Sequence, residues 1–171
     1  TTTVVNVPCA GTATGSIDLT VAGGTGPSTY LWNSGAVIED PSNIAAGNYT
    51  VIITDANGCA GVASATLTEP TSALSGSISS QTNVSVNGAN DGAVTVDGSG
   101  GVAPYMYKLG SGTYQVSGIF ATLTAGLYTV TVQDANLCTF DVPVTITEPN
   151  IPLTGSISSQ VNVSCFGGND G

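Results

Sequence analysis

Two stretches of this chain repeat almost word for word at one constant offset of 79 residues. YTVIITDANGC at residues 49 to 59 returns as YTVTVQDANLC at 128 to 138, and LSGSISSQTNVS at 74 to 85 returns as LTGSISSQVNVS at 153 to 164. A period of this length is too long for one coil of a solenoid and suits a small self-contained domain. The chain is therefore predicted to be a tandem array of domains.

The repeat divides the chain into three parts, because an Asn-Val pair recurs at residues 6, 83 and 162. Residues 1–71 are interpreted as a first repeat that lacks its N-terminal part, residues 72–150 as a second repeat, and residues 151–171 as the start of a third. We favour a window cut from a longer polypeptide. The alternative is that subunits exchange end strands in a polymer.

Short runs of alternating apolar and polar residues indicate β-strands in both repeats. Ile17 and Leu19 alternate with polar residues in the first repeat, as Val130 and Val132 do in the second. Gly-rich turns separate the runs. The expected strands lie at 2–8, 15–22, 28–33, 36–39, 48–54 and 59–68, then at 74–86, 92–97, 104–109, 113–120, 127–133 and 138–147. This spacing predicts an all-β protein built of β-sandwiches.

One local motif narrows the sandwich to an immunoglobulin-like one. IAAGNY at 44–49 and LTAGLY at 123–128 place an aliphatic residue, a Gly and a Tyr as a tyrosine corner does. Tyr49 and Tyr128 are therefore predicted to bond backbone upstream. Trp32 falls on the third strand, where such sandwiches bury a Trp in the core. The predicted fold is all-β, with tandem immunoglobulin-like β-sandwich domains.

The four cysteines suggest an oxidising, extracellular setting. Cys9 on the first strand and Cys59 at the start of the last are predicted to form a disulfide, which closes a loop of about 50 residues and contributes roughly 4 kcal/mol in the chain-entropy model. Val86 occupies the position of Cys9 in the second repeat, so Cys138 lacks the equivalent partner. Cys138 and Cys165 are expected to be unpaired or inter-domain, and a bridge between them is one option.

The charge balance argues against several classes of function. The 171 residues include one Lys or Arg, eleven Asp or Glu and no His. Nucleic acid is not an expected partner, because phosphate binding requires basic residues. General acid and base catalysis has few groups to use, so no enzyme is predicted. Lys108 is the single Lys, which argues against an isopeptide bond in every repeat. No apolar run approaches the roughly 18 residues of a membrane span.

Two kinds of binding site stay open as alternatives. Exposed tyrosines on one sheet face would suit a carbohydrate-binding module, and the candidates for glycan contact are Tyr30, Tyr105 and Tyr107. No cofactor is expected, but calcium at the domain junctions is a second option because acidic residues recur near turns and linkers. The candidate ligands are Asp55, Glu69, Asp91, Asp134, Glu148 and Asp170. Asp in such turns more often bonds the backbone.

Several motifs together resemble the SprB-type repeat of Bacteroidetes cell-surface gliding adhesins. They are GGTGPSTYLWNSG at 23–35, NIAAGNYTVIITDANGC at 43–59 and TLTEP at 66–70, and NVSCFGGNDG at 162–171 resembles the opening of the same repeat. The resemblance implies a very long secreted adhesin at the cell surface, exported by the type IX system and used in gliding. The second repeat departs from the pattern at Val86 and lacks the Trp.

These observations favour a structural and adhesive stalk in an extracellular filament at the cell surface. Thr68-Glu69-Pro70 and Thr147-Glu148-Pro149 lead almost directly into the next strand, so the array is predicted to be semi-rigid. Its expected partners are neighbouring repeats of the same chain or filament, with surface glycans as a further candidate. The alternative function is an array of carbohydrate-binding modules or a spacer attached to a secreted enzyme.

Overall fold

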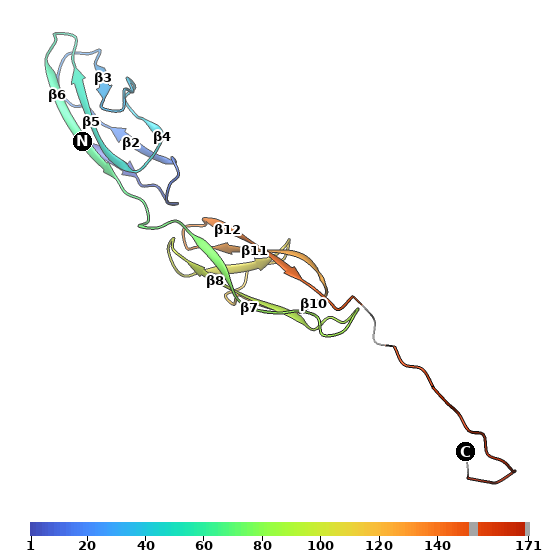
Figure 1. Ribbon diagram of the computed structural model, residues 1–171. Coiled ribbons are helices and arrows are strands. Elements are labelled where there is room, and N and C mark those ends of the chain that lie inside the picture. The colour runs from blue at the N-terminus through green and yellow to red at the C-terminus, as the bar shows by residue number, and fades with distance from the viewer. Residues whose placement is uncertain (151–153, 170–171) are drawn as a thin grey trace.

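The computed structural model describes residues 1–150 and 154–169. Within these ranges every regular element is a β-strand, and the strands form four three-stranded antiparallel sheets. Figure 1 shows two β-rich units that follow one another along the chain, with the C-terminal segment leading away from the second unit. The prediction of an all-β protein is confirmed.

Each unit contains six strands. Those of the first repeat are β1 (Thr2–Val5), β2 (Gly15–Leu19), β3 (Thr29–Trp32), β4 (Ser42–Ile44), β5 (Gly47–Thr54) and β6 (Ala60–Leu67). Those of the second repeat are β7 (Ser75–Thr82), β8 (Gly92–Ser99), β9 (Met106–Leu109), β10 (Ile119–Leu123), β11 (Gly126–Gln133) and β12 (Thr139–Ile146). The predicted boundary between residues 71 and 72 falls in the link between β6 and β7.

The two units share one topology. In the first repeat the sheets have the orders β1-β2-β4 and β3-β5-β6, and in the second β7-β8-β10 and β9-β11-β12. With the six strands named A, B, C, E, F and G, these are the A-B-E and C-F-G sheets of an immunoglobulin-like sandwich. The predicted immunoglobulin-like fold is therefore confirmed for both repeats.

Two strand predictions were wrong in position. Residues 36–39 form a loop rather than a strand, and the short strand β4 follows it. The Trp32 side chain accounts for this loop, because its Nε1 donates to the Ile38 carbonyl at 2.8 Å. In the second repeat the strand expected at 113–120 begins only at Ile119, and Gln115 makes one isolated bridge to Tyr107.

The first strand of each repeat also reaches the opposite sheet. Beyond β1, the Val7 N–H donates to the Thr68 carbonyl at 2.9 Å, and Thr68 N–H donates back to Asn6 Oδ1 at 2.9 Å. Val84 and Thr147 make the same bond in the second repeat. This crossing ties the start of each sandwich to its end, so the turn after the first strand lies next to the linker that leaves the repeat.

Each repeat has its own hydrophobic core. The first core contains buried Ile17, Leu19, Trp32, Val51, Ala65 and Leu67. The second contains Val84, Val94, Val96, Tyr107, Leu123, Val130, Val132, Val142, Val144 and Ile146. Neither cluster includes residues of the other, which is the packing expected of two separate domains.

Candidate functional site

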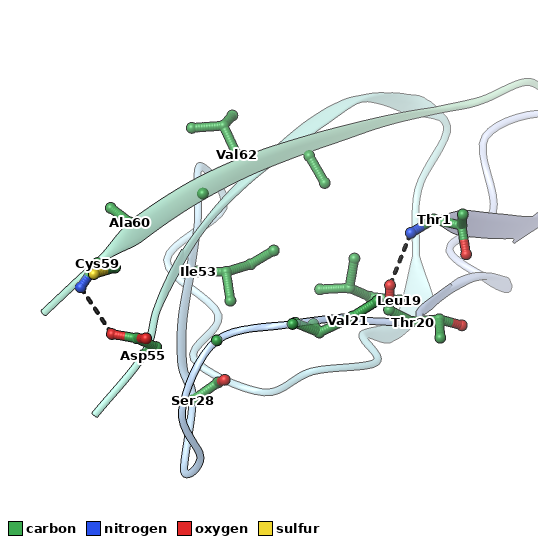
Figure 2. Close-up of a pocket in the computed structure, with 15 residues that line it drawn as sticks. Thr1, Leu19, Thr20, Val21, Ser28, Ile53, Asp55, Cys59, Ala60 and Val62 are labelled. Carbon is green, nitrogen blue, oxygen red and sulfur yellow. Dashed lines mark hydrogen bonds between the residues drawn. The ribbon is translucent and has the colours of Figure 1, made fainter. Parts of the chain in front are cut away.

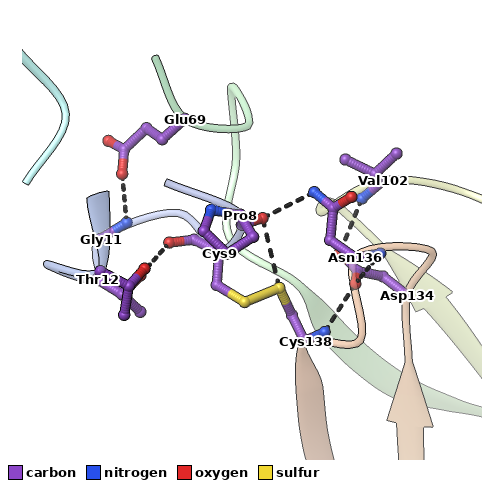
Figure 3. Close-up of a disulfide and its surroundings, with 10 residues drawn as sticks. Pro8, Cys9, Gly11, Thr12, Glu69, Val102, Asp134, Asn136 and Cys138 are labelled. Carbon is purple, nitrogen blue, oxygen red and sulfur yellow. Dashed lines mark hydrogen bonds between the residues drawn. A yellow bond between two sulfur atoms is a disulfide. The ribbon is translucent and has the colours of Figure 1, made fainter. Parts of the chain in front are cut away.

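The junction between the repeats is closed by a disulfide between Cys9 and Cys138 (Figure 3). The Cα atoms lie 5.8 Å apart although the residues are 129 positions apart in the chain. The predicted bridge between Cys9 and Cys59 is wrong, and so is the option of a bridge between Cys138 and Cys165. Cys59 and Cys165 are both free and exposed. Cys138 was predicted to be either unpaired or inter-domain, and the inter-domain alternative is confirmed.

The sandwich geometry explains why Cys9 does not bond Cys59. Cys59 precedes β6, whereas Cys9 closely follows Val7, which bonds Thr68 just beyond the other end of β6. A strand of eight residues spans about 26 Å at roughly 3.3 Å per residue. Because disulfides need Cα atoms within about 7 Å, the two turns are too far apart. Cys9 can only meet a cysteine of the next repeat.

The turn that carries Cys9 is fixed by the linker. Thr12 donates from both its N–H and its Oγ1 to the Cys9 carbonyl, at 3.1 and 2.7 Å. Gly11, which has φ of +77°, donates its N–H to Glu69 Oε2 at 2.6 Å. Gly88 and Glu148 repeat this contact at 2.6 Å in the second repeat. The linker glutamate therefore orients the turn that follows the first strand of each repeat.

A buried carboxylate positions the other cysteine. Asp134 is only 2% exposed. Its Oδ1 accepts from the N–H groups of Asn136 and Cys138, both at 2.9 Å, and its Oδ2 accepts from Val102 N–H at 2.9 Å. These three donors compensate for the burial of the charge. The turn between β11 and β12 is thereby held in one conformation, with Cys138 facing the first repeat.

The disulfide is supported by a direct hydrogen bond between the repeats. Asn136 Nδ2 donates to the Pro8 carbonyl at 2.8 Å, next to the bridge (Figure 3). Asn136 and Pro8 were not singled out by the sequence analysis. A sequence signal for Asn136 does exist, because the Asp-Ala-Asn-x-Cys pattern occurs in both repeats. What the sequence analysis missed is that this turn lies at one end of the sandwich.

The same turn is built in the first repeat without a partner. Asp55 Oδ1 accepts from Asn57 N–H at 2.9 Å and Cys59 N–H at 2.8 Å, and Oδ2 accepts from Thr25 N–H at 3.1 Å. The backbone bond from Thr25, followed by that from Cys59, lowers the pKa of Asp55 below its usual value. The carboxylate form is thus the one that the folded turn stabilises.

We expect Asp55→Asn to change how stability responds to acid. Because the pKa of Asp55 is lower in the folded than in the unfolded chain, the ionised group adds stability above the unfolded pKa of about 3.9. That stability is lost as the pH falls through the folded pKa. Urea unfolding between pH 2 and 7 should show a shallower acid decline in the variant, and an unchanged slope would contradict this account.

The candidate calcium ligands lie in separate places. Asp55, Asp134, Glu69 and Glu148 accept backbone N–H groups as described above. Asp91 accepts Ser85 N–H at 3.0 Å, and its contacts with Ser85 lower its pKa. Asp170 lies outside the described residues. In residues 1–150 and 154–169, no group of three or more possible ligand side chains comes together.

The tyrosines divide into corners and core residues. Tyr49 donates to the Ala45 carbonyl at 2.9 Å and Tyr128 to the Thr124 carbonyl at 3.1 Å, so both predicted tyrosine corners are confirmed. Tyr107 is buried in the second core and accepts Gly98 N–H at 3.1 Å. Its prediction as a glycan contact is therefore wrong, because a buried ring cannot stack on a sugar.

The other two glycan candidates are half-buried. Tyr105 packs on the second core and donates to the Gly100 carbonyl at 2.6 Å. Tyr30 packs on the first core, and partial desolvation, followed by a hydrogen bond to Glu39, raises its pKa. They belong to different repeats and form no shared aromatic face. A glycan role for them stays a prediction.

A family model decides what kind of repeat this is. The model named SprB repeat matches residues 1–37 and 78–115, which start at the first strand of each sandwich and extend past the third. Each sandwich thus contains a segment that matches the SprB repeat. The first SprB repeat and the second are thus the two domains that the disulfide joins.

Other comparisons of these SprB repeats are more distant. Among curated proteins none matches the chain. Among solved structures, three N-terminal domains of the Highly Immunogenic Outer Capsid protein (Hoc) of bacteriophage RB49 are 18% identical, with a TM-score of 0.41. That match covers 78% of this chain and 54% of the Hoc chain, so the SprB repeats span about half of that structure. No helix in the described residues is long and apolar enough for a membrane span.

Proposed function

We propose that the chain is a structural stalk segment of a long adhesin at the cell surface. The observation that carries this proposal is the Cys9–Cys138 bridge, which joins one SprB repeat to the next outside the peptide linker. A disulfide suits an extracellular protein, because reducing cytosol would keep the thiols free. The SprB repeat is of the type found in cell-surface adhesins, and gliding or attachment is the role we propose for the whole filament.

The contacts at the junction between the repeats restrict bending, which a stalk requires. Two small sandwiches joined by linker alone would rotate freely, as domains with small interfaces do. Here the disulfide, the Asn136 to Pro8 hydrogen bond and the Glu69 to Gly11 hydrogen bond act on the same turn. The disulfide and the Asn136 bond cross the junction, and the Glu69 bond fixes the turn to which both attach, so together they oppose bending. We therefore infer a stiff joint rather than a flexible tether between these repeats.

The proposal predicts where the protein is found. Antibodies raised against residues 1–150 should label intact, unpermeabilised cells that produce it, with immunogold particles on thin projections beyond the envelope. A preparation of permeabilised cells serves as the control for access. Label that is seen only after permeabilisation would contradict the proposal.

A further inference from the structure

The outward face of the sheet β3-β5-β6 in the first repeat carries a row of exposed aliphatic side chains. Leu31 of β3 lies opposite Ile52 of β5, and Ile52 lies opposite Val62 of β6. These three side chains are 53, 46 and 70% exposed, whereas their chain neighbours Trp32 and Val51 are buried in the core. The row therefore crosses all three strands on the side of the sheet that an antiparallel sandwich usually makes polar.

The second repeat carries polar and charged side chains in the same three positions. Lys108 lies opposite Thr131, and Thr131 lies opposite Asp141. Thr131 Oγ1 donates to Asp141 Oδ1 at 2.7 Å, and Lys108 Nζ lies 5.0 Å from the centre of the Tyr114 ring. The same sandwich is thus built without an apolar row, so the stability of the fold does not account for the row in the first repeat.

The row would also stay exposed in a longer chain. In the second repeat, the start of β7 covers the inward side of the sheet, where a Cβ added to Gly76 would lie 2.8 and 2.7 Å from Val132 and Val142. Asp141 faces outward at the position of Val62 and is exposed although that segment is present. Figure 2 shows Val62 likewise pointing away from the inward side of β6. A segment that precedes β1 would therefore leave the row open.

The charge of the chain restricts what can approach this face. The three strands TYLW, GNYTVIIT and AGVASATL contain no Asp, Glu, Lys or Arg. The whole chain carries eleven acidic residues and a net charge of −10, so two copies repel each other over much of their surface. When this face of one copy meets the same face of another, the strands bring no like charges together.

The side chains beside the row suit a second copy of the same face. Thr54, opposite Thr29, lies on one side of the row, and Thr50, opposite Ser64, lies on the other. A two-fold axis along the row, between two such faces, places Thr50 of each copy over Thr54 of the other. Because a hydroxyl both donates and accepts, the two sets can bond each other while the aliphatic rows pack together.

We propose that the outward face of β3-β5-β6 binds the same face of a second copy, so that neighbouring filaments associate side by side through this repeat. The second repeat, with its charged row, takes no part in the contact. The inference goes beyond the stalk role and rests on it only for the presence of neighbouring filaments.

The size of the face determines the strength of the contact. Strands of up to eight residues, at about 3.3 Å each and about 4.8 Å apart, give a face of roughly 400 Å². A stable interface buries about 800 Å² on each partner. One contact is therefore weak and reversible, and several contacts in register along two filaments make the association persist.

Amide spectra of the purified chain by nuclear magnetic resonance test the contact. Samples are compared between about 0.05 and 1 mM, a range that detects weak affinities. All carry Cys59→Ser and Cys165→Ser, so that the exposed thiols cannot cross-link copies. We expect shifts that grow with concentration and gather on the outward residues of β3, β5 and β6, together with slower tumbling of the molecule.

A loss variant removes the row without changing the net charge. Leu31→Thr, Ile52→Thr and Val62→Thr together should abolish both the shifts and the slower tumbling, since Thr suits an exposed strand and the second repeat already has Thr131 there. The matched control makes the same change at three exposed aliphatic residues of the second repeat and should behave as the parent. Its substitutions are Val116→Thr, Ile119→Thr and Leu127→Thr.

The second repeat allows the converse experiment. Lys108→Leu, Thr131→Ile and Asp141→Val give it the aliphatic row of the first repeat. The net charge stays at −10, because one cation and one anion are lost together. Each chain then carries two such faces, so we expect species larger than dimers under conditions in which the parent forms dimers.

Four results would overturn the inference. They are spectra that do not change with concentration, shifts that gather on another surface, an equal loss of association in the matched control, and a gain variant that associates no further than the parent. Because the samples are purified protein, these results leave the immunogold test of the stalk role untouched. Label confined to permeabilised cells would contradict the stalk role and leave the contact between purified copies standing.

Discussion

Pulling the chain by its two ends should extend it far less with the Cys9–Cys138 bridge than without it. The load enters at β1, crosses the disulfide and leaves through β12, so everything between the two cysteines is bypassed. The bypassed chain spans 129 positions, which would add roughly 450 Å when fully extended at about 3.5 Å per residue. The bridge holds those ends at a Cα separation of 5.8 Å.

Single-molecule force spectroscopy measures this difference directly. The double variant Cys9→Ser with Cys138→Ser should show two unfolding events and the full gain in contour length, because both sandwiches then carry the load. Cys59→Ser is the matched control, since it removes the cysteine of the equivalent turn in the first repeat, which forms no disulfide. The same total extension for the intact and the double-variant chain would refute the bypass.

Asp134→Ala should destabilise the second repeat by about 3 kcal/mol, since it leaves three backbone N–H groups without an acceptor. The side chain is almost fully buried, so water cannot replace the lost bonds without opening the turn. The same change should slow formation of the disulfide, because Cys138 loses the contact that holds its backbone. Refolding with timed thiol alkylation gives the rate, and urea unfolding gives the stability.

The matched control is Asp55→Ala in the first repeat. Asp55 accepts the same three kinds of backbone bond but lies at a more exposed end of its sandwich. Removing its carboxylate should therefore lower the free energy of unfolding clearly less than removing that of Asp134. Equal losses for the two variants would show that burial and the junction add nothing to the role of Asp134.

Most of the fold could be predicted from the sequence because its signals are local. Alternation placed β5, β6, β11 and β12 to within about a residue, and these strands pair over their full lengths. The tyrosine corners identified the topology, since the bond from Tyr49 to Ala45 spans only four residues. The misplaced strands are short edge segments whose bounds depend on tertiary contacts such as the Trp32 to Ile38 bond.

The disulfide could not be predicted because its geometry is not local. Cys9 lies in the turn that follows β1, and Cys59 in the turn that precedes β6, so the two cysteines are at opposite ends of the sandwich. In an antiparallel sandwich this placement separates the two residues by the full length of the domain. The repeat pattern does point to the observed pairing. Val86 occupies the position of Cys9 in the second repeat, so that repeat offers no cysteine to the junction that follows it. Its Cys138 is available for the junction with the first repeat.

The covalent loop also affects how the chain responds to proteolysis. Lys108 is the single Lys or Arg of the chain, and it lies between Cys9 and Cys138. A trypsin-like cut after Lys108 would open the backbone in β9, yet the two fragments would stay joined through the bridge. A filament built on such loops can be nicked at its one basic residue without being severed.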